Sequence, residues 1–572
     1  MEKRVLLAVL LSFVVLYVYQ ALMPSPPEPK PAATKPAVTQ QPTPSAAQQP
    51  ASAAPAGSTL PAEAPVTGQP ADAERDVVVD GADVHAVFST RGGSLKSWRL
   101  KKYADAQGQP LDLVPHNVPA DAVRPFTLAA DDAGVSARLW RGTFTPSAES
   151  ITVSTGTQTL QFDYRDASGL VAAKTFTFSA AHPYVVTMSA AVTNNGQPVN
   201  PTIEWGPALG TGVVLHSRSY NPPPQPLFFR DGKVTRVAPT KIAAQPVEEG
   251  IFGFAGADDH YFATVIVGSA PLHLQYQALD VPIPGVEDGA HFVIWSARFA
   301  APPQNARFFL GPKDFDVLAS VDLDLVRAID FGMFSWLVVP LLRALKWING
   351  YIGNYGWSLI TLTVLINLAM FPLRHKSVVS MRKMQEIQPE VKAIQDRYAK
   401  LKMSDPARQK MNVELMNLYR ERGVNPASGC VPMLLTLPVL FAFYSLLAVA
   451  IELRGAPFTL WIHDLSAPDP LFVTPILMGI TQLVQQKMVP AATDPTQQRV
   501  MLIMPIVFTG MFLWAPSGLV IYWTTTNLWG IGQQLITNRL IGPTKPRTVR
   551  PPAERRIKRV GGGRTDQAKD RS

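Results

Sequence analysis

The residues of this 572-residue chain that could do chemistry in an unusual setting are polar side chains within long apolar stretches. Thr363 and Asn367 are four residues apart, as are Trp523 and Asn527, so within a helix each pair shares one face. Polar groups in hydrocarbon are costly and tend to face a bundle interior or a wet cavity. Hydrogen bonding between helices, worth roughly 0.6 kcal/mol each, accounts for any single residue, but their presence on three stretches favours a polar groove. The remaining members of the set are Thr361, Thr481, Gln482, Gln485, Gln486, Thr524, Thr525, Thr526, Gln533 and Gln534.

The sequence contains no arrangement of residues that indicates catalysis. A Walker A loop, an H-E-x-x-H helix and a G-x-S-x-G elbow are absent, and Gly210-Thr211-Gly212 lacks the third glycine of a dinucleotide-binding loop. His463-Asp464 has no neighbouring serine nucleophile, so we read this pair as loop structure. The single Cys430 excludes an intramolecular disulfide framework and a cysteine zinc cluster. We therefore expect a protein that is not an enzyme and that holds no cofactor or metal.

The elements that must position the polar residues are apolar stretches long enough to cross a membrane. Residues 5–23 are uncharged and, at about 1.5 Å per helical residue, span a hydrocarbon core of ~30 Å. They predict a retained anchor rather than a cleavable signal peptide, because the stretch exceeds a usual h-region and no A-x-A site precedes Pro24. No stretch has an unpaired Asp, Glu or Arg near its centre, which argues against an ion-coupled transporter. The other five are Trp357 to Leu373, Val431 to Leu453, Leu471 to Val484, Val500 to Trp514 and Gly518 to Ile536.

One further apolar stretch, Phe331 to Ile348, resembles a span but has a different pattern. Its apolar residues recur at spacings of three and four, while Asp330, Arg343 and Lys346 bound or interrupt it. This pattern predicts an amphipathic helix that lies in the membrane interface rather than crossing the membrane.

Two segments before it have contrasting compositions. Residues 24–70 carry 13 prolines among Ala, Gln, Thr and Ser, which predicts an extended tether. From about Asp76 to Asp316, short alternating runs are separated by turn signals such as Asn194-Asn195-Gly196 and Asp231-Gly232. Period-two alternation between turns predicts one large all-β domain of the sandwich class.

The charges orient this arrangement. With six spans and a cytoplasmic N-terminus, the net charge is +16 on the cytoplasmic side and −7 on the other side, out of +9 for the chain. This distribution follows the positive-inside rule. If Phe331 to Ile348 also crossed, residues 374–430 and the basic tail would face outward, so we reject that topology. The excess of positive charge is therefore not a DNA-binding surface.

The charged segment between the first two later spans predicts a helical hairpin. Met384, Ile387, Val391, Ile394, Tyr398 and Leu401 follow the spacing of a coiled-coil seam. Met411, Leu415 and Leu418 continue it after the turn Met403-Ser404-Asp405-Pro406, where Ser404 or Asp405 can cap the second helix. The hairpin is either a plain connection or a basic docking arm for ribosome, nascent chain or anionic lipid. The spacing does not decide between these two interpretations.

Several motifs in the membrane part resemble the YidC/Oxa/Alb family of membrane protein insertases, and specifically its Gram-negative YidC type with a large periplasmic domain. The resemblance covers the chain in order and is strongest from about Phe331 to Leu540. The motifs are Asn354-Tyr355-Gly356-Trp357-Ser358, Asn425-Pro426 with Gly429-Cys430 and Pro432, Leu460-Trp461-Ile462-His463-Asp464-Leu465-Ser466, Asp494-Pro495, and Pro516-Ser517-Gly518-Leu519-Val520.

The resemblance implies an insertase and chaperone of the bacterial inner membrane that works without nucleotide hydrolysis, alone or with the Sec translocon. Its implied partners are nascent membrane proteins, the translocon with its accessory subunits, the ribosome through the hairpin and basic tail, and the lipid bilayer. It also implies a β-supersandwich similar to sugar mutarotases, and a groove formed by five spans that is open to cytoplasm and lipid but closed outward. The substrate contacts that it carries over are Thr363, Leu437, Pro438, Leu440, Trp514 and Trp523, the last at a position that is commonly tyrosine.

One position departs from the family pattern. The family groove usually carries an arginine at the position of Asn367. Arg374 lies seven residues further on, on roughly the same face and about 10 Å nearer the cytoplasm. We therefore expect Asn367 to keep the groove wet and Arg374 to supply the positive charge from its mouth, while Asn527 is a further residue of the substrate groove.

The predicted fold is a polytopic helical membrane bundle with an all-β periplasmic domain and a cytoplasmic hairpin, both termini being cytoplasmic. The main alternative is a membrane-anchored periplasmic carbohydrate-binding protein or enzyme, which predicts a cluster of histidine and carboxylate in a cleft of the sandwich. The predicted boundaries are residues 1–23 for the anchor, 24–72 for the linker, 73–320 for the β domain, 321–350 for the interfacial helix, 351–540 for the five-span core with its hairpin at 374–430, and 541–572 for the basic tail.

Overall fold

The computed structural model forms two compact units, Met1–Asp330 and Phe331–Ser572. The predicted anchor and linker, and residues 542–572 of the predicted tail, lie outside the residues that the structure describes. The described residues are 74–105, 107–119, 121–209, 223–283, 286–398, 407–423, 431–488 and 495–541.

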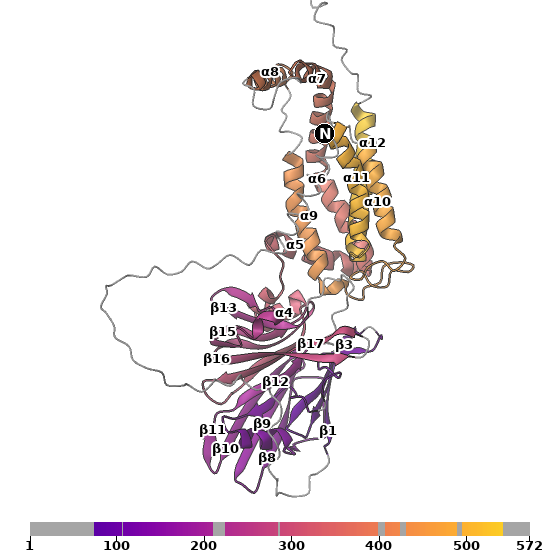
Figure 1. The fold of residues 1–572 in the computed structure, drawn as a ribbon. Helices are drawn as coiled ribbons and strands as arrows, with labels where there is room; N and C mark the ends of the chain where they lie inside the picture. Colours follow the sequence, from indigo (N-terminus) through magenta and orange to yellow (C-terminus); the bar gives the residue numbers. More distant parts are fainter. Residues whose placement is uncertain are drawn as a thin grey trace, which may run out of the picture. The chain divides into compact units, whose positions relative to one another are not determined.

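The first unit is built from strands, as the alternating sequence predicts (Figure 1). Among the described residues of this unit, four short helices accompany the strands: α2 (Ala133–Arg141), α3 (Pro239–Ile242), α4 (Phe315–Val321) and η1 (Leu325–Ala328). The strands are β1 (Asp76–Gly81), β2 (Val84–Ser89), β3 (Ser94–Ala104), β4 (Pro110–Asp112), β5 (Thr127–Ala129), β6 (Thr145–Pro146), β7 (Ser150–Val153), β8 (Thr157–Arg165), β9 (Leu170–Ser179), β10 (His182–Asn194), β11 (Gln197–Val199), β12 (Thr202–Ala208), β13 (Gln225–Arg230), β14 (Lys233–Arg236), β15 (Val247–Asp258), β16 (Phe262–Ile283), β17 (Val286–Phe299) and β18 (Ala306–Pro312).

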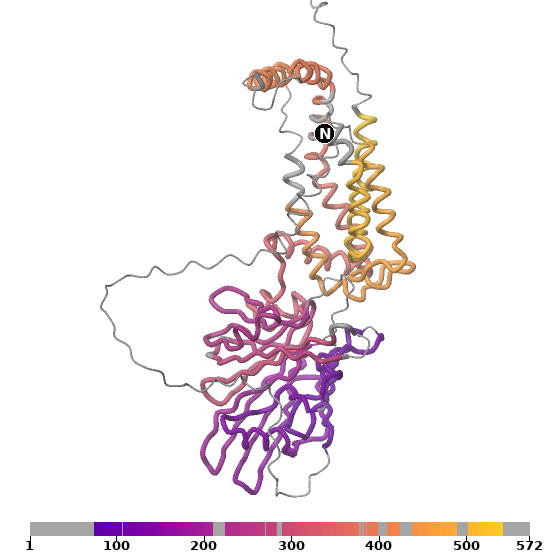
Figure 2. Tube along the Cα trace, in the orientation of Figure 1, coloured from indigo at the N-terminus to yellow at the C-terminus, as the bar shows by residue number. Residues whose placement is uncertain are grey.

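These strands form two sheets. The smaller has five strands in the order β4-β3-β2-β1-β7, with β1 and β7 parallel. The larger has thirteen strands along the path β14-β13-β15-β16-β18-β10-β9-β8-β6, and β11, β12, β17 and β5 pair off this path. Strand β10 pairs on one side with β9, which directly precedes it in sequence, and on the other side with the much later β18. The sequence colouring of the trace in Figure 2 helps to follow the chain through this unit.

Local sequence explains the strands and their turns. Along β9 the residues alternate strictly between buried and partly buried, as expected for a strand with one face in a core. Asn195 and Gly196, with φ of 52° and 78°, join β10 to β11, and Asp231 and Gly232, with φ of 53° and 76°, join β13 to β14. Two consecutive positive φ values are typical of the tight hairpin turn that Asn-Gly and Asp-Gly favour. Both predicted turns are therefore confirmed.

Large aromatic side chains fill the core of this unit. Trp205 and Trp295 stack with ring centroids 5.0 Å apart, and Phe126 lies edge-on to Trp205 at 4.9 Å. Lys174 of β9 is fully buried beside them, and its Nζ donates to the carbonyl oxygens of Gly92, Gly93 and Phe126 at 2.6, 3.2 and 2.7 Å. A buried ammonium group needs such partners because it has lost its water.

The described part of the second unit is helical (Figure 1). Each of the five later stretches that the sequence predicts as a span contains a helix. By length and hydropathy, one segment of the described residues, Tyr355–Lys376, is long and apolar enough to cross a membrane, and Pro438–Val449 and Leu502–Phe512 are shorter apolar helices. The elements are α5 (Ser335–Ile352), α6 (Tyr355–Glu386), α7 (Gln388–Arg397), α8 (Ala407–Glu421), α9 (Val431–Val449), η3 (Ile451–Leu453), α10 (Val473–Met488), α11 (Pro495–Phe512) and α12 (Ser517–Ile541).

The predicted amphipathic helix is α5, shifted by four residues at each end. Val338, Leu341, Leu345 and Ile348 are buried, as the three-and-four spacing predicts. The helix ends at Gly353, whose φ of 72° is the left-handed conformation that stops a helix.

The predicted hairpin is formed by α7 and α8, and α6 continues without a break into the charged segment. Ile387, Val391 and Leu418 of the predicted seam form a small buried cluster. Arg422 pairs with Glu390 at 2.7 Å across the two helices. Leu401 and the predicted cap at Ser404 or Asp405 lie outside the described residues.

Candidate functional site

Two polar side chains lie on the inward face of α6. Thr363 is 0% exposed and Asn367 4%. The Thr363 Oγ1 donates to the Leu359 carbonyl at 2.7 Å, and the Asn367 Nδ2 donates to the Thr363 carbonyl at 2.8 Å. Because both bonds return to the carbonyl four residues earlier, they orient the Asn367 amide and leave its Oδ1 as an acceptor.

Arg374 supplies the donor for that oxygen. Its Nη1 lies 2.8 Å from the Asn367 Oδ1, although the two residues are seven positions apart. Side chains on a helix lean toward its N-terminus, so the Arg374 side chain runs back along α6 and, together with the Asn367 side chain, bridges an axial rise of about 10 Å. The positive charge of Arg374 is therefore held against Asn367, deeper in the unit than the position of Arg374 in the sequence suggests.

Three helices carry polar residues at the same depth. α6, α10 and α12 begin at the same end of the unit (Figure 1), and Thr363, Thr481 and Thr524 follow their first residues by eight, eight and seven positions. At about 1.5 Å per residue this is a depth of roughly 12 Å. All three threonines are buried. We call the depth marked by Thr363, Thr481 and Thr524 the polar level of these three helices.

Asn527 connects two of these helices. Its Nδ2 lies 3.3 Å from the Met478 carbonyl and 3.3 Å from the Thr481 Oγ1, both on α10. Asn527 therefore makes the interhelical hydrogen bonds that were the simpler interpretation of a polar residue in a span.

The two tryptophans of the predicted substrate contacts lie in different surroundings. Trp514, in the turn between α11 and α12, is partly exposed. Trp523 packs on α11, with ring centroids 5.1 Å from Phe512 and 5.8 Å from Phe508.

The predicted contacts on α9 lie near its middle. Pro438 and Leu440 are partly buried, and the side chain of Leu437 lies outside the described residues. Further along α9, the Phe443 ring stacks on Tyr522 of α12 at 4.4 Å. Tyr522 is a buried contact that the sequence analysis missed, and its position beside the predicted Trp523 is the only sequence signal that could have found it.

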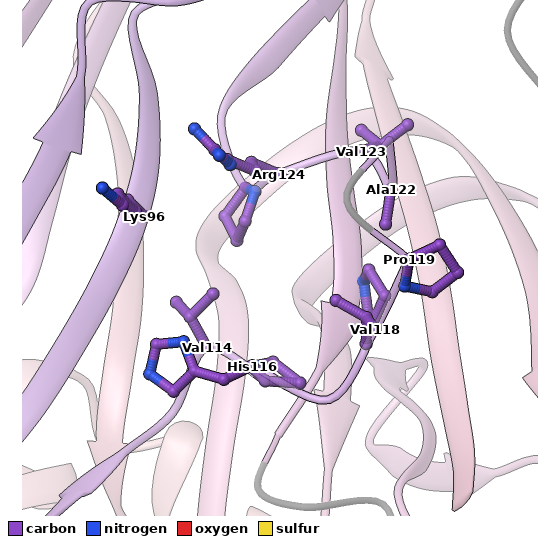
Figure 3. Close-up of a pocket in the computed structure, with 11 residues that line it drawn as sticks. Lys96, Val114, His116, Val118, Pro119, Ala122, Val123 and Arg124 are labelled. Atoms are coloured by element: carbon purple, nitrogen blue, oxygen red, sulfur yellow. The ribbon is translucent and has the colours of Figure 1, made fainter. Parts of the chain in front are cut away.

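The β unit holds a pocket of about 170 Å³, which bears on the carbohydrate alternative (Figure 3). His116 lines it and lies 2.9 Å from the Asp112 Oδ2, so a histidine and a carboxylate do meet at a cleft. The same carboxylate also accepts from the Ser97 hydroxyl and from the backbone N–H groups of Trp98 and Val114. Bonds from strand β3 and from the following turn therefore saturate Asp112, which leaves it poorly suited to act as a base.

The basic residues of the pocket are also engaged. Lys96 pairs with Asp76 at 2.8 Å, and Arg124 pairs with Glu74 at 2.6 Å. Within the described residues, no group of three or more His, Cys, Asp or Glu side chains could hold a metal ion.

Comparison with known proteins decides between the insertase and carbohydrate alternatives. Residues 76–344 match the family described as YidC periplasmic domain, and residues 347–544 match the family described as 60Kd inner membrane protein. A membrane protein insertase YidC of Geobacter metallireducens is 36% identical over 555 residues, which cover 95% of this chain and 99% of the relative. The chain belongs to the YidC family of membrane protein insertases. Its β unit is the periplasmic domain of that family, and its helical unit is the inner-membrane part.

Other YidC relatives give the same result. The proteins of that name from Geobacter sulfurreducens and Ralstonia nicotianae are 37% and 33% identical, over 95% and 87% of this chain and 99% and 89% of the relatives. Among solved structures, a crystal structure of the active YidC insertase with its first transmembrane domain resolved has a TM-score of 0.33 at 17% identity, covering 82% of this chain and 93% of that one. A putative aldose 1-epimerase from Escherichia coli has a TM-score of 0.23 at 13% identity, covering 42% of this chain and 100% of that one.

Sequence reasoning also missed a buried carboxylate in this YidC-family chain. Asp469 is 0% exposed and lies in the segment between η3 and α10. Its oxygens accept from the Trp461 Nε1, the Leu471 N–H, the Thr474 N–H and the Thr474 hydroxyl at 2.7 to 2.9 Å. The bonds from Thr474 cap the start of α10, and an Asp shortly before an apolar helix is a local sequence signal for such a cap. The bond to Trp461 has no corresponding signal in the sequence.

Proposed function

We propose that this chain inserts hydrophobic segments of nascent membrane proteins into the inner membrane through the polar level formed by α6, α10 and α12, and that it also assists their folding and assembly. The single observation that carries the proposal is the hydrogen bond from the Arg374 guanidinium to Asn367, whose amide in turn donates to the Thr363 carbonyl on the inward face of α6. A polar tail that enters from the cytoplasm meets this charge and the polar side chains instead of ~30 Å of hydrocarbon. Its apolar segment then enters lipid by burial of apolar surface, so the step uses no nucleotide.

The proposed topology has both termini and the α7–α8 hairpin in the cytoplasm. It places α5 in the membrane–water interface on the periplasmic side of the inner membrane. The exposed face of α5 supports this placement, because Trp336 and Trp347 are 69% and 64% exposed there. Tryptophan and tyrosine side chains favour the membrane–water interface. Ribosome docking by the hairpin and basic tail, and cooperation with the Sec translocon, belong to the same proposal.

Photocrosslinking to a stalled ribosome–nascent chain tests the substrate path. A photoreactive amino acid at Trp523 should crosslink to the hydrophobic segment of the nascent chain. The same amino acid at Ile506, which is 65% exposed on α11, is the matched control and should crosslink weakly. Equal crosslinking at both positions would contradict the proposed path.

Charge variants test the role of Arg374. Arg374→Ala should slow insertion of a single-span substrate with an acidic tail by about tenfold, the equivalent of roughly 1.4 kcal/mol, and change a neutral-tailed substrate much less. Asn367→Asp should have a similar effect, because the new carboxylate neutralises the guanidinium that lies 2.8 Å from Oδ1. If Arg374→Ala inserts the acidic-tailed substrate at the unmodified rate, the proposed role of this charge is wrong.

A further inference from the structure

The start of α5 is fixed to one face of α9. Just before α5, the carbonyl oxygen of Phe331 accepts from the Ser445 hydroxyl of α9 at 2.8 Å. The ring of Phe334 stacks on the ring of Phe441, with centroids 5.9 Å apart and 6° between the planes. Phe441 and Ser445 are four residues apart, so both contacts come from the same side of α9.

An ion pair joins the later half of α5 to the segment that follows α9. The Lys346 Nζ lies 3.2 Å from the Glu452 Oε1, and the two side chains are 25% and 6% exposed. Glu452 belongs to η3, in which Ile451 and Leu453 are buried on either side of it. A carboxylate enclosed in this way needs a cation, because an unpaired charge is costly to remove from water. The pair therefore holds the end of α9 against α5.

The sequence of α9 gives these contacts a purpose. Pro438 lies inside the helix and has no N–H group, so the backbone hydrogen bond to the carbonyl four residues earlier is missing there. A helix bends most readily at such a point. Phe441, Ser445 and Glu452 all follow Pro438 in the chain, so the contacts to α5 restrain the part of α9 that the proline leaves free to bend.

We infer that the ion pair between Lys346 and Glu452 positions the substrate-contacting part of α9. The pair sets where α5 holds α9 beyond Pro438, and thus where Leu440 meets the nascent chain. This inference rests on the proposed function, in which Leu440 contacts substrate. Lys346 and Glu452 act through α9 and are positioning residues that do not touch the substrate themselves.

A crosslink between α5 and α9 in the full-length protein tests the positioning without any substrate. Phe334→Cys and Phe441→Cys are combined in a Cys430→Ser background and joined by a short bifunctional maleimide. Glu452→Gln and Lys346→Met should each slow this crosslink by about fivefold, because each leaves a buried charge without its partner. Lys346→Glu combined with Glu452→Lys should restore the parent rate.

Photocrosslinking to a stalled ribosome–nascent chain tests the consequence for substrate. A photoreactive amino acid is placed at Leu440 on α9 or at Trp523 on α12. Glu452→Gln should lower crosslinking from Leu440 by about fivefold and leave crosslinking from Trp523 as in the parent, because the pair restrains α9 and not α12. A general loss of folding would lower both, and the exchanged charge pair should restore the signal from Leu440.

Lys233→Met is the matched control. It makes the same change as Lys346→Met at an exposed position on β14, so both kinds of crosslinking should stay as in the parent. Glu452→Asp is the second variant in case Glu452→Gln does not accumulate. It keeps the charge but shortens the side chain by one methylene group, so it should slow the cysteine crosslink less than Glu452→Gln does.

The outcomes separate this inference from the proposed function. If the single variants crosslink Phe334→Cys to Phe441→Cys at the parent rate, the ion pair does not position α9 and the inference is wrong. It is equally wrong if crosslinking from Leu440 and Trp523 falls together. If the parent crosslinks a nascent chain from neither position while the cysteine crosslink responds as expected, the proposed function fails and the positioning of α9 stands.

Discussion

Two buried ionisable residues of the β unit should change its stability with pH in opposite directions. Lys174 is surrounded by core, and burial lowers its pKa to about 7. Glu204 of β12 is largely buried, and burial raises its pKa to about 7. Folding favours the neutral form of both side chains. Lys174 becomes neutral by losing a proton, whereas Glu204 becomes neutral by gaining one.

For Lys174, the unfolded chain binds the additional proton between pH ~7 and ~10, so the free energy of unfolding should rise with pH by up to about 1.4 kcal/mol per unit. Lys174→Met should abolish this rise. It should also destabilise the unit by at least about 2 kcal/mol at pH 7, since three buried carbonyls lose their donor. Denaturant unfolding of the full chain, monitored by hydrogen exchange in β9, measures both the pH dependence and the loss of stability. Lys233→Met, at an exposed position on β14, should change stability by no more than about 0.5 kcal/mol.

For Glu204, the folded chain binds the additional proton, so stability should be greatest below pH ~4.5 and should fall as the pH rises to ~7. The Oε2 of Glu204 is a buried atom that lacks a hydrogen-bond partner among the described residues. Glu204→Gln removes the charge and keeps the shape, so it should stabilise the unit at pH 8 and flatten the dependence between pH 5 and 7. Thermal melts at pH 5, 6, 7 and 8 test this, with the exposed Glu149→Gln as control. Equal pH profiles for Glu204→Gln and the parent would contradict the prediction.

At the residue scale, the sequence predicts well which residues share a helix face, and poorly which atoms a long side chain contacts. The spacing of Thr363 and Asn367 places them on one buried face, which the structure confirms. The rise per residue places Arg374 about 10 Å away, yet its guanidinium bonds to Asn367, because backbone spacing ignores the length and lean of the side chain. Asp469 accepts from the indole of Trp461, eight residues earlier in the same loop, and no local sequence pattern encodes that contact.

At the scale of elements, the approach of α10 to α11 depends on one glycine. A Cβ at Gly479 would overlap the Thr509 Oγ1 and lie 3.2 Å from the Thr509 Cβ. Gly479→Ala should therefore separate the two helices and lower the free energy of unfolding by about 1–3 kcal/mol, in spite of the better helix propensity of alanine. Gly479→Ala with Thr509→Ala should recover most of the loss, which a double-mutant cycle of melting temperatures in detergent measures.

The control lies on the neighbouring helix. A methyl group added to Gly510 of α11 would meet no atom within 4 Å, so Gly510→Ala should be neutral or stabilising by up to about 1 kcal/mol. If both alanine variants behave alike, close packing at Gly479 does not hold α10 and α11 together.

Elements were predictable where local chemistry determines them. The Asn-Gly and Asp-Gly turns and the seam at Val391 and Leu418 follow from propensity and periodicity. The extent of α6 does not, because nothing local stops it at the end of the apolar stretch, and it continues to Glu386 with Pro372 inside it. The pairing of β10 with β18 also depends on the whole sheet, since more than a hundred residues separate the partners.

At the scale of the whole molecule, the uneven distribution of charge along the chain predicts a membrane topology, which the accessibility of introduced cysteines can test. Gln107 lies in the β unit and Gln409 in α8 of the hairpin, and both are exposed. The stretch between them contains α5 and α6, of which the proposal has α6 alone crossing the membrane. In a Cys430→Ser background, an impermeant maleimide added after permeabilising the outer membrane should label Gln107→Cys at once, and Gln409→Cys after the inner membrane is opened.

The same pair of cysteines separates the alternatives, because each places them differently. If α5 crossed as well, both positions would lie on the same side and would be labelled together. If the net +6 charge of residues 374–430 faced outward, Gln409→Cys would react first, against the positive-inside rule. Labelling of Gln107→Cys alone therefore requires one crossing between the β unit and the hairpin, which fixes α5 on the membrane surface and places Arg374, at the hairpin end of α6, nearest the cytoplasm from which substrates arrive.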